Sequence, residues 1–112
     1  MSVDRSAMRM VRLSARIPAI AFAHFLAGRY DEAVAWAEVA LPKHGGYQGT
    51  HRVLAASHAL AGRLDAARVA MAGMRALNPK MRIADLSTLI PWRRPDDARR
   101  YAEGLRLAGL PD

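Results

Sequence analysis

The chain of 112 residues has no cysteine, which excludes disulfides, thiolate metal sites and cysteine nucleophiles. Aromatic residues make up only 6% of it, and no stretch reaches the roughly 18 apolar residues that a membrane-spanning helix needs. No segment alternates cleanly between apolar and polar residues, so there is no strand candidate. The remaining composition, 52% hydrophobic and rich in Ala and Leu, favours an all-helical domain. Because nothing ties the chain to an oxidising compartment or a membrane, we expect a cytoplasmic protein.

Signals for catalysis or cofactor binding are equally sparse. Acidic residues are few and stand at predicted helix starts, where capping explains them. His51 and His58 lie seven residues apart, wider than the i, i+4 spacing of a helical metal clip. The glycine-rich segment 45–49 (GGYQG) lacks the lysine and the preceding strand of a phosphate-binding loop. We therefore expect no metal, no other cofactor and no enzymatic activity.

Positive charge dominates, with 17 Lys and Arg against 10 Asp and Glu and a formal net charge of +7. Such a balance permits binding to nucleic acid or to acidic surfaces. The densest basic segment is 92–101 (WRRPDDARRY), where Trp92 and Tyr101 flank Arg93-Arg94 and Arg99-Arg100. Aromatic stacking combined with phosphate contacts is how single strands are bound, although two aspartates offset the charge here. Nucleic-acid binding is therefore the alternative function rather than the leading one.

The strongest signal is an internal repeat. Residues 24–33 (HFLAGRYDEA) and 58–67 (HALAGRLDAA) are identical at seven of ten positions, at an offset of 58 − 24 = 34 residues. A period of 34 is typical of a repeated helix–turn–helix unit. The glycines of the match, Gly28 and Gly62, can adopt the left-handed conformation that ends a helix. The recurrence of His24 at His58 is then architectural rather than catalytic.

Apolar periodicity and breaker residues predict six helices, with boundaries uncertain by about two to four residues; they span 17–27, 30–41, 47–61, 64–77, 82–89 and 96–107. Residues 1–16 are predicted as an N-terminal extension, partly helical or disordered, and residues 17–112 as the repeat domain. Pro42 is expected to end the second helix and Pro79 to follow the fourth. Two full repeats are followed by a third unit. This third unit is degenerate, because prolines interrupt it and it is two residues shorter than the repeat period.

Seven residues define the repeat, and together they resemble the tetratricopeptide pattern: Gly28, Tyr30, Ala33, Gly62, Leu64, Ala67 and Pro79. The resemblance implies a solenoid of antiparallel helix hairpins. The run 25–111, with its Leu-Asn-Pro at 77–79 and Gly-Leu-Arg-x-x-Gly-Leu-Pro at 104–111, is similar to the C-terminal repeat region of bacterial adenylate/guanylate cyclases and related signalling proteins. This narrower likeness implies the tail of a signalling protein, without any cyclase activity of its own.

Repeats of this kind act by binding. Their first helices line a concave face, where the resemblance implies that a peptide or partner domain lies. The repeat register places eight side chains of a predicted partner groove on that face: Phe22, Phe25, Arg52, Ala56, Ala59, Ile83, Leu86 and Arg93. Such a groove suits an amphipathic helix or an extended peptide with acidic groups. The alternative is that the two phenylalanines simply pack between helices.

A short repeat array has a stability problem. Three or more repeats are normally needed, and uncapped end repeats leave apolar surface open. We therefore also expect the chain to form a homodimer, or to dock onto an upstream domain, through its first or last helix.

Overall fold

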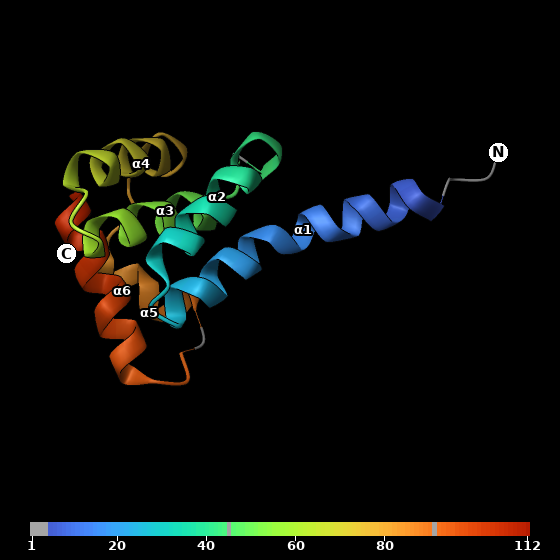
Figure 1. Ribbon diagram of the computed structural model, residues 1–112. Helices are drawn as coiled ribbons and strands as arrows, with labels where there is room; N and C mark the ends of the chain where they lie inside the picture. The colour runs from blue at the N-terminus through green and yellow to red at the C-terminus, as the bar shows by residue number, and fades with distance from the viewer. Residues whose placement is uncertain (1–4, 45, 91) are drawn as a thin grey trace.

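The computed structural model describes residues 5–44, 46–90 and 92–112, with side chains from residue 16 onward except those of residues 43 and 44. These residues form helices and no strand, which confirms the all-helical class (Figure 1). The elements are α1 (Arg5–Leu26), α2 (Tyr30–His44), α3 (Gln48–Leu60), α4 (Leu64–Leu77), the 3-10 helix η1 (Ile83–Asp85), α5 (Leu86–Leu89) and α6 (Pro95–Ala108). Within the described ranges, none of the helices combines the length and the apolar character needed to cross a membrane.

The first four helices form two hairpins. Helix α1 packs against α2 and α3 packs against α4, while α2 lies against α3 and joins the hairpins side by side (Figure 1). Alanines stand where the helices meet, and Ala33, Ala37 and Ala67 are completely buried. Small side chains allow close helix approach, which accounts for the burial of the repeat-defining residues Ala33 and Ala67.

The turns of the two hairpins have the same conformation. Gly28 and Gly62 have positive φ angles of 79° and 86°, which other residues adopt only with strain. In each copy the N–H of the arginine after the glycine donates to the carbonyl oxygen of the histidine five residues earlier, at 2.9 Å in the first and 2.8 Å in the second. The sequence match at an offset of 34 residues therefore corresponds to a structural repeat of the turn.

The polar side chains of the two turns repeat as well. Arg29 Nε donates to His24 Nδ1 at 3.0 Å, and Arg63 Nε donates to His58 Nδ1 at 2.9 Å. Burial, and then the charge of Arg63, lower the pKa of His58, so its ring stays neutral and Nδ1 can accept. Arg63 also lies 3.0 Å from the carboxylate of Asp31, an ion pair that joins the second turn to the start of α2.

Two helix boundaries differ from the sequence prediction. Helix α1 begins at Arg5, so the predicted start at residue 17 is not a break in the helix, and its N-terminal half extends away from the other helices (Figure 1). Helix α2 continues through Pro42 to His44, so the predicted end at residue 41 is wrong. A proline forfeits one backbone hydrogen bond, but its fixed φ is compatible with a helix, which can continue where packing supports it. The predicted structure of residues 1–4 lies outside the described residues.

The third unit departs most from a hairpin. Its first part is reduced to η1 and the four-residue α5, and α6 packs against α3 and α4 instead of pairing with a full-length helix. Gly104 of α6 approaches α3 so closely that an added Cβ would lie 3.0 Å from the carbonyl oxygen of Ala56. The C-terminal end of the chain lies against η1, where the Ile83 N–H donates a hydrogen bond to the Pro111 carbonyl oxygen at 2.8 Å. Helix α6 therefore covers one face of the α3–α4 hairpin.

The contact between α6 and α3 generates the first prediction. We expect Gly104→Leu to lower the free energy of unfolding by about 1–3 kcal/mol, because the added side chain meets the backbone of α3. Leucine is a better helix former than glycine, so helix propensity cannot explain a loss. Urea unfolding followed by circular dichroism measures the change. Gly46→Ala is the control, since no atom lies within 4 Å of its added Cβ; equal effects of the two substitutions would contradict the close packing.

Candidate binding groove

A groove of about 570 Å³ opens between α1, α3, α5 and α6, within the range of roughly 300–1,000 Å³ typical of ligand sites. Its rim carries Tyr47 and Leu89, which are 55% and 52% exposed. Its floor carries Arg52, Val53 and Tyr101, all buried. The lining residues are Pro18, Ala19, Phe22, Tyr47, Gly49, Arg52, Val53, Leu89, Ile90 and Tyr101.

Aromatic rings form one wall of this groove and the core behind it. The Tyr101 ring lies edge-on to Phe22, with centroids 5.6 Å apart, and edge-on to Phe25 at 5.2 Å. Trp92 covers Tyr101 at 5.4 Å and Phe22 at 5.9 Å. Burial raises the pKa of Tyr101 to about 12, although nearby Arg52 acts in the opposite direction. The phenol therefore stays protonated at neutral pH.

Arg52 is the one charged side chain among the residues that line the groove, and only 8% of it is exposed. Its positive charge lies near the Tyr101 hydroxyl and opposes the rise in the pKa of that group. Its Nε has no hydrogen-bond partner within the described part of the chain, and none of the ion pairs found there involves it. A buried guanidinium without a carboxylate is costly, so this side chain is suited to receive an anionic group.

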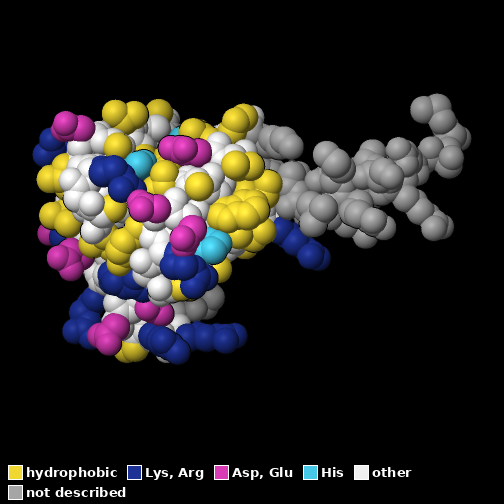
Figure 2. Space-filling model, viewed as in Figure 1, with side chains coloured by type: hydrophobic (Ala, Val, Ile, Leu, Met, Phe, Trp, Pro, Cys, Tyr) yellow, Lys and Arg dark blue, Asp and Glu magenta, His cyan; other side chains and the backbone are white. Residues whose placement is uncertain are grey.

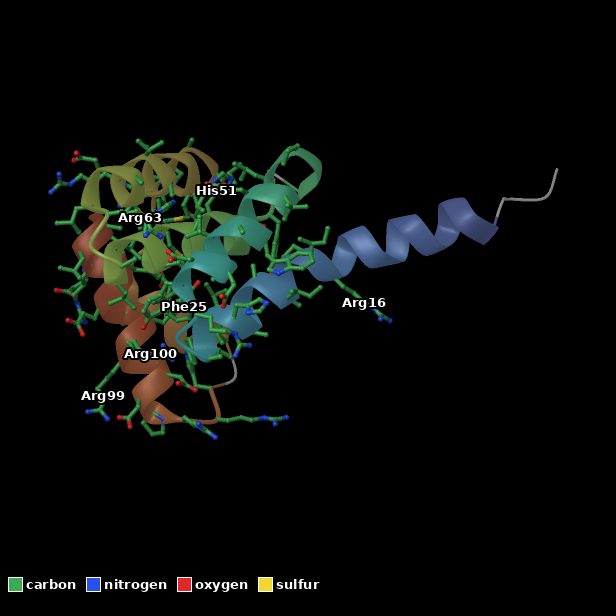
Figure 3. The ribbon with its side chains drawn as sticks, in the orientation of Figure 1. Arg16, Phe25, His51, Arg63, Arg99 and Arg100 are labelled. Atoms are coloured by element: carbon green, nitrogen blue, oxygen red, sulfur yellow. The ribbon has the colours of Figure 1, made fainter. Side chains whose placement is uncertain are left out.

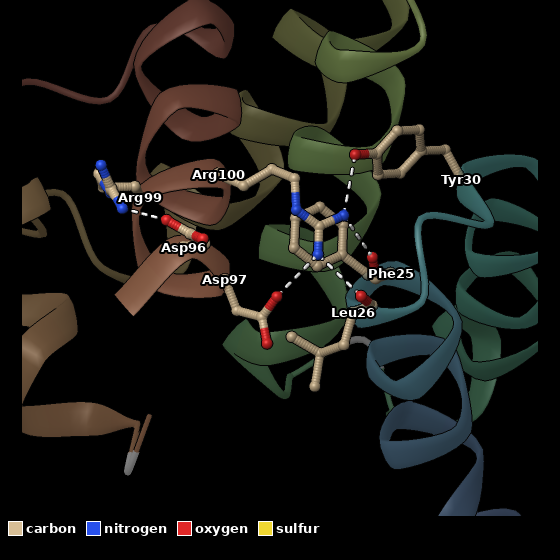
Figure 4. Close-up of polar contacts among 7 residues, drawn as sticks. All are labelled: Phe25, Leu26, Tyr30, Asp96, Asp97, Arg99 and Arg100. Atoms are coloured by element: carbon tan, nitrogen blue, oxygen red, sulfur yellow. Dashed lines mark hydrogen bonds and ion pairs between the residues drawn. The ribbon is translucent and has the colours of Figure 1, made fainter. Parts of the chain in front are cut away.

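Arg100 of α6 fastens that helix to the end of α1 (Figure 4). Its guanidinium donates to the carbonyl oxygens of Phe25 at 3.1 Å and Leu26 at 2.8 Å, in the last turn of α1. The Phe25 oxygen also accepts from the N–H of Gly28 at 2.9 Å. It also donates to the Tyr30 hydroxyl at 3.0 Å and to Asp97 Oδ1 at 3.1 Å. Burial acts to lower the pKa of Arg100, but these two partners outweigh it and raise the pKa.

The basic segment 92–101 divides into inward and outward side chains. Arg100 points toward Phe25 and the end of α1, whereas Arg99 points away from the body of the molecule (Figure 3). Arg93 and Arg94 are exposed with Arg99, and basic side chains gather where α6 begins (Figure 2). Of the aromatic residues expected to stack on bases, Tyr101 is buried, and Trp92 packs partly buried against it.

Of the eight predicted groove residues, two line the groove and six do not. Phe22 and Arg52 line the groove. Phe25 and Ala56 are completely buried, the first against Tyr101 and the second against Gly104, because α6 lies on the face of α1 and α3. Of the other predicted residues, three are buried and one is exposed, namely Ala59, Ile83 and Leu86, and Arg93. For Phe25, packing between helices is therefore what the structure shows.

Several lining residues escaped sequence analysis. Tyr101 and Ile90 come from the third unit, whose packing no repeat register describes. Tyr47 precedes α3 and its ring folds over Gly49, where an added Cβ would lie 2.7 Å from the ring. The Gly-x-x-Gly spacing around Tyr47 in segment 45–49 was a local signal, and the absence of a side chain at Gly49 is what leaves room for the ring.

In the described part of the chain, no group of three or more His, Asp or Glu side chains is placed to hold a metal ion. No protein-family model matches this chain, and no curated protein or solved structure is significantly similar to it. What the groove binds must therefore be argued from its own geometry and chemistry.

The four hydrogen bonds of Arg100 generate the second prediction. We expect Arg100→Gln to lower the free energy of unfolding by about 2 kcal/mol, because two helix-end carbonyls and Asp97 lose a charged donor. Arg99→Gln is the matched control: its pair with Asp96 is exposed and should contribute less than about 0.5 kcal/mol. Urea unfolding measures both. Equal losses would show that the contacts of Arg100 with α1 do not stabilise the fold.

The burial of Tyr101 generates the third prediction. Its pKa is about 12 in the folded protein against 10.0 for an unperturbed tyrosine, so the unfolded chain loses this proton first as the pH rises. Stability from this group is fully present below pH 10 and falls by about 2–3 kcal/mol by pH 12. The measurement is the free energy of unfolding across this range for the wild type and Tyr101→Phe. The variant should show the shallower decline, and parallel curves would contradict a protonated, buried phenol.

Proposed function

We propose that this chain is a protein-interaction module of the tetratricopeptide kind, which binds a peptide or partner domain in the groove between α1, α3, α5 and α6. The observation that carries the proposal is the groove itself: an apolar cleft of about 570 Å³ on the side of α1 and α3. A second support is the pair of equivalent hairpins with identical glycine turns, 34 residues apart. Repeat folds of this type work by presenting such a concave surface.

The lining of the groove is suited to a peptide. Phe22, Val53 and Ile90 supply apolar and aromatic area, and the half-exposed Tyr47 and Leu89 stand at the rim, where a bound chain would leave the groove. Clefts of this composition receive the apolar side chains of amphipathic helices or extended segments. Buried aromatic and arginine side chains are also the residues that most often dominate binding energy at such sites.

The likeness to the repeat regions of bacterial cyclases leads us to propose a signalling context. In this proposal, the chain recruits or positions a protein partner and carries no catalytic step of its own. Helix α6 supports the proposal of a defined binding site, because it packs on α3 and α4 and forms one side of the groove.

A peptide selection provides the test and the fourth prediction. Peptides selected from a displayed random library against the full chain should bind about tenfold more weakly to Leu89→Asp, because a charge then stands at the apolar rim. Val69→Asp is the matched control, since Val69 is 74% exposed on α4 and does not line the groove. Calorimetry measures both affinities. Failure to select any peptide, or equal weakening by the two substitutions, would count against the groove as a partner site.

A further inference from the structure

We propose that the groove is a binding site for a small monocarboxylate, with its carboxylate on Arg52 and its apolar body against Phe22, Val53 and Ile90. This inference goes beyond the proposed partner binding, because it requires no protein partner and can be measured on the chain alone. It rests on the burial and bonding of Arg52, on the character of the groove walls and on the volume available.

The burial of Arg52 favours an anionic ligand. More than nine-tenths of the residue is buried, and its Nε lacks a hydrogen-bond partner among the described residues. The neighbouring Tyr101 hydroxyl is uncharged and cannot neutralise the guanidinium. Because Arg52 lines the groove, a carboxylate bound there can pair with its guanidinium. A ligand carboxylate would therefore supply a counter-charge.

The other arginines of the chain show what is unusual about this one. Arg63 pairs with Asp31, Arg100 with Asp97, and Arg106 with Asp112. These three guanidinium groups are more exposed than Arg52, with 41%, 27% and 52% of their side chains accessible. The most buried arginine is thus one that no ion pair within the described residues reaches, the reverse of what desolvation alone favours.

The walls of the groove indicate the chemical character of the rest of the ligand, beyond its carboxylate. The lining residues other than Arg52 are apolar, aromatic or glycine. A single cation among such walls matches one negative charge on an apolar body better than a phosphate, which carries more charge and needs more donors. The volume of about 570 Å³ accommodates an alkyl or arylalkyl chain of moderate length. Octanoate is a suitable probe, because it has one carboxylate and a flexible apolar tail.

The experiment compares octanoate with octanamide, which has the same tail and no charge, by calorimetry on the full chain. We expect octanoate to bind and octanamide to bind at least about tenfold more weakly, since only the carboxylate pairs with a guanidinium. Acetate, which has the charge without the tail, should also bind at least about tenfold more weakly than octanoate. Equal affinity for octanoate and octanamide, or no measurable binding of octanoate, would overturn the proposal.

Two variants test whether Arg52 is the residue that causes the preference for octanoate over octanamide. Arg52→Gln should remove the preference for octanoate over octanamide, whereas Arg68→Gln, which removes the same charge from an exposed position on α4, should keep it. Retention of the preference in Arg52→Gln would place the carboxylate elsewhere and overturn the assignment. If Arg52→Gln does not fold, as judged by circular dichroism, the comparison of the two ligands on the wild type still decides whether the carboxylate is recognised. Peptide selection uses a different probe, so either proposal can fail without the other.

Discussion

The packing of α6 against α3, from which α6 side chains reach the end of α1, is the constraint on which the rest of the structure depends. Gly104 sets the distance between α6 and α3, because its missing side chain lets the two backbones approach at Ala56. At that distance Arg100 reaches the carbonyl oxygens of Phe25 and Leu26 at the end of α1. Tyr101, the next residue, enters the aromatic cluster and forms part of the groove floor. One helix therefore completes the core, ties down the first hairpin and shapes the binding site.

The position of α6 also explains why the groove is small. In an extended repeat array the whole face of the first helices would be open to a partner. Here α6 buries Phe25 and Ala56, and the open part is confined to the region between α1, α3 and α5. Covering this face removes apolar surface from water, which a short array of two hairpins needs. The remaining cleft gains an enclosed floor with a buried arginine, which a fully open concave face would not have.

Several of the arginines that make the chain basic form contacts within the protein. Arg29 and Arg63 each bond to the histidine of their own turn, and Arg100 bonds to the end of α1. Arg52 lies at the base of the groove. These four of the 17 basic residues thus serve internal structure or the candidate site. Beside the exposed cluster at the start of α6, Tyr101 is buried and Trp92 packs partly buried against it.

The sequence by itself determined the helical class and the two glycine turns. Those features depend on residues only a few positions apart: a glycine that accepts positive φ at Gly28 or Gly62, and a histidine five residues before its arginine. Only the tertiary structure decided the position of α6, the continuation of α2 through Pro42 and the lining of the groove. Arg100 and Phe25 are 75 residues apart, and no local preference acts over that separation. Such contacts follow from how whole helices pack to bury their apolar faces, which the periodicity of each helix alone does not specify.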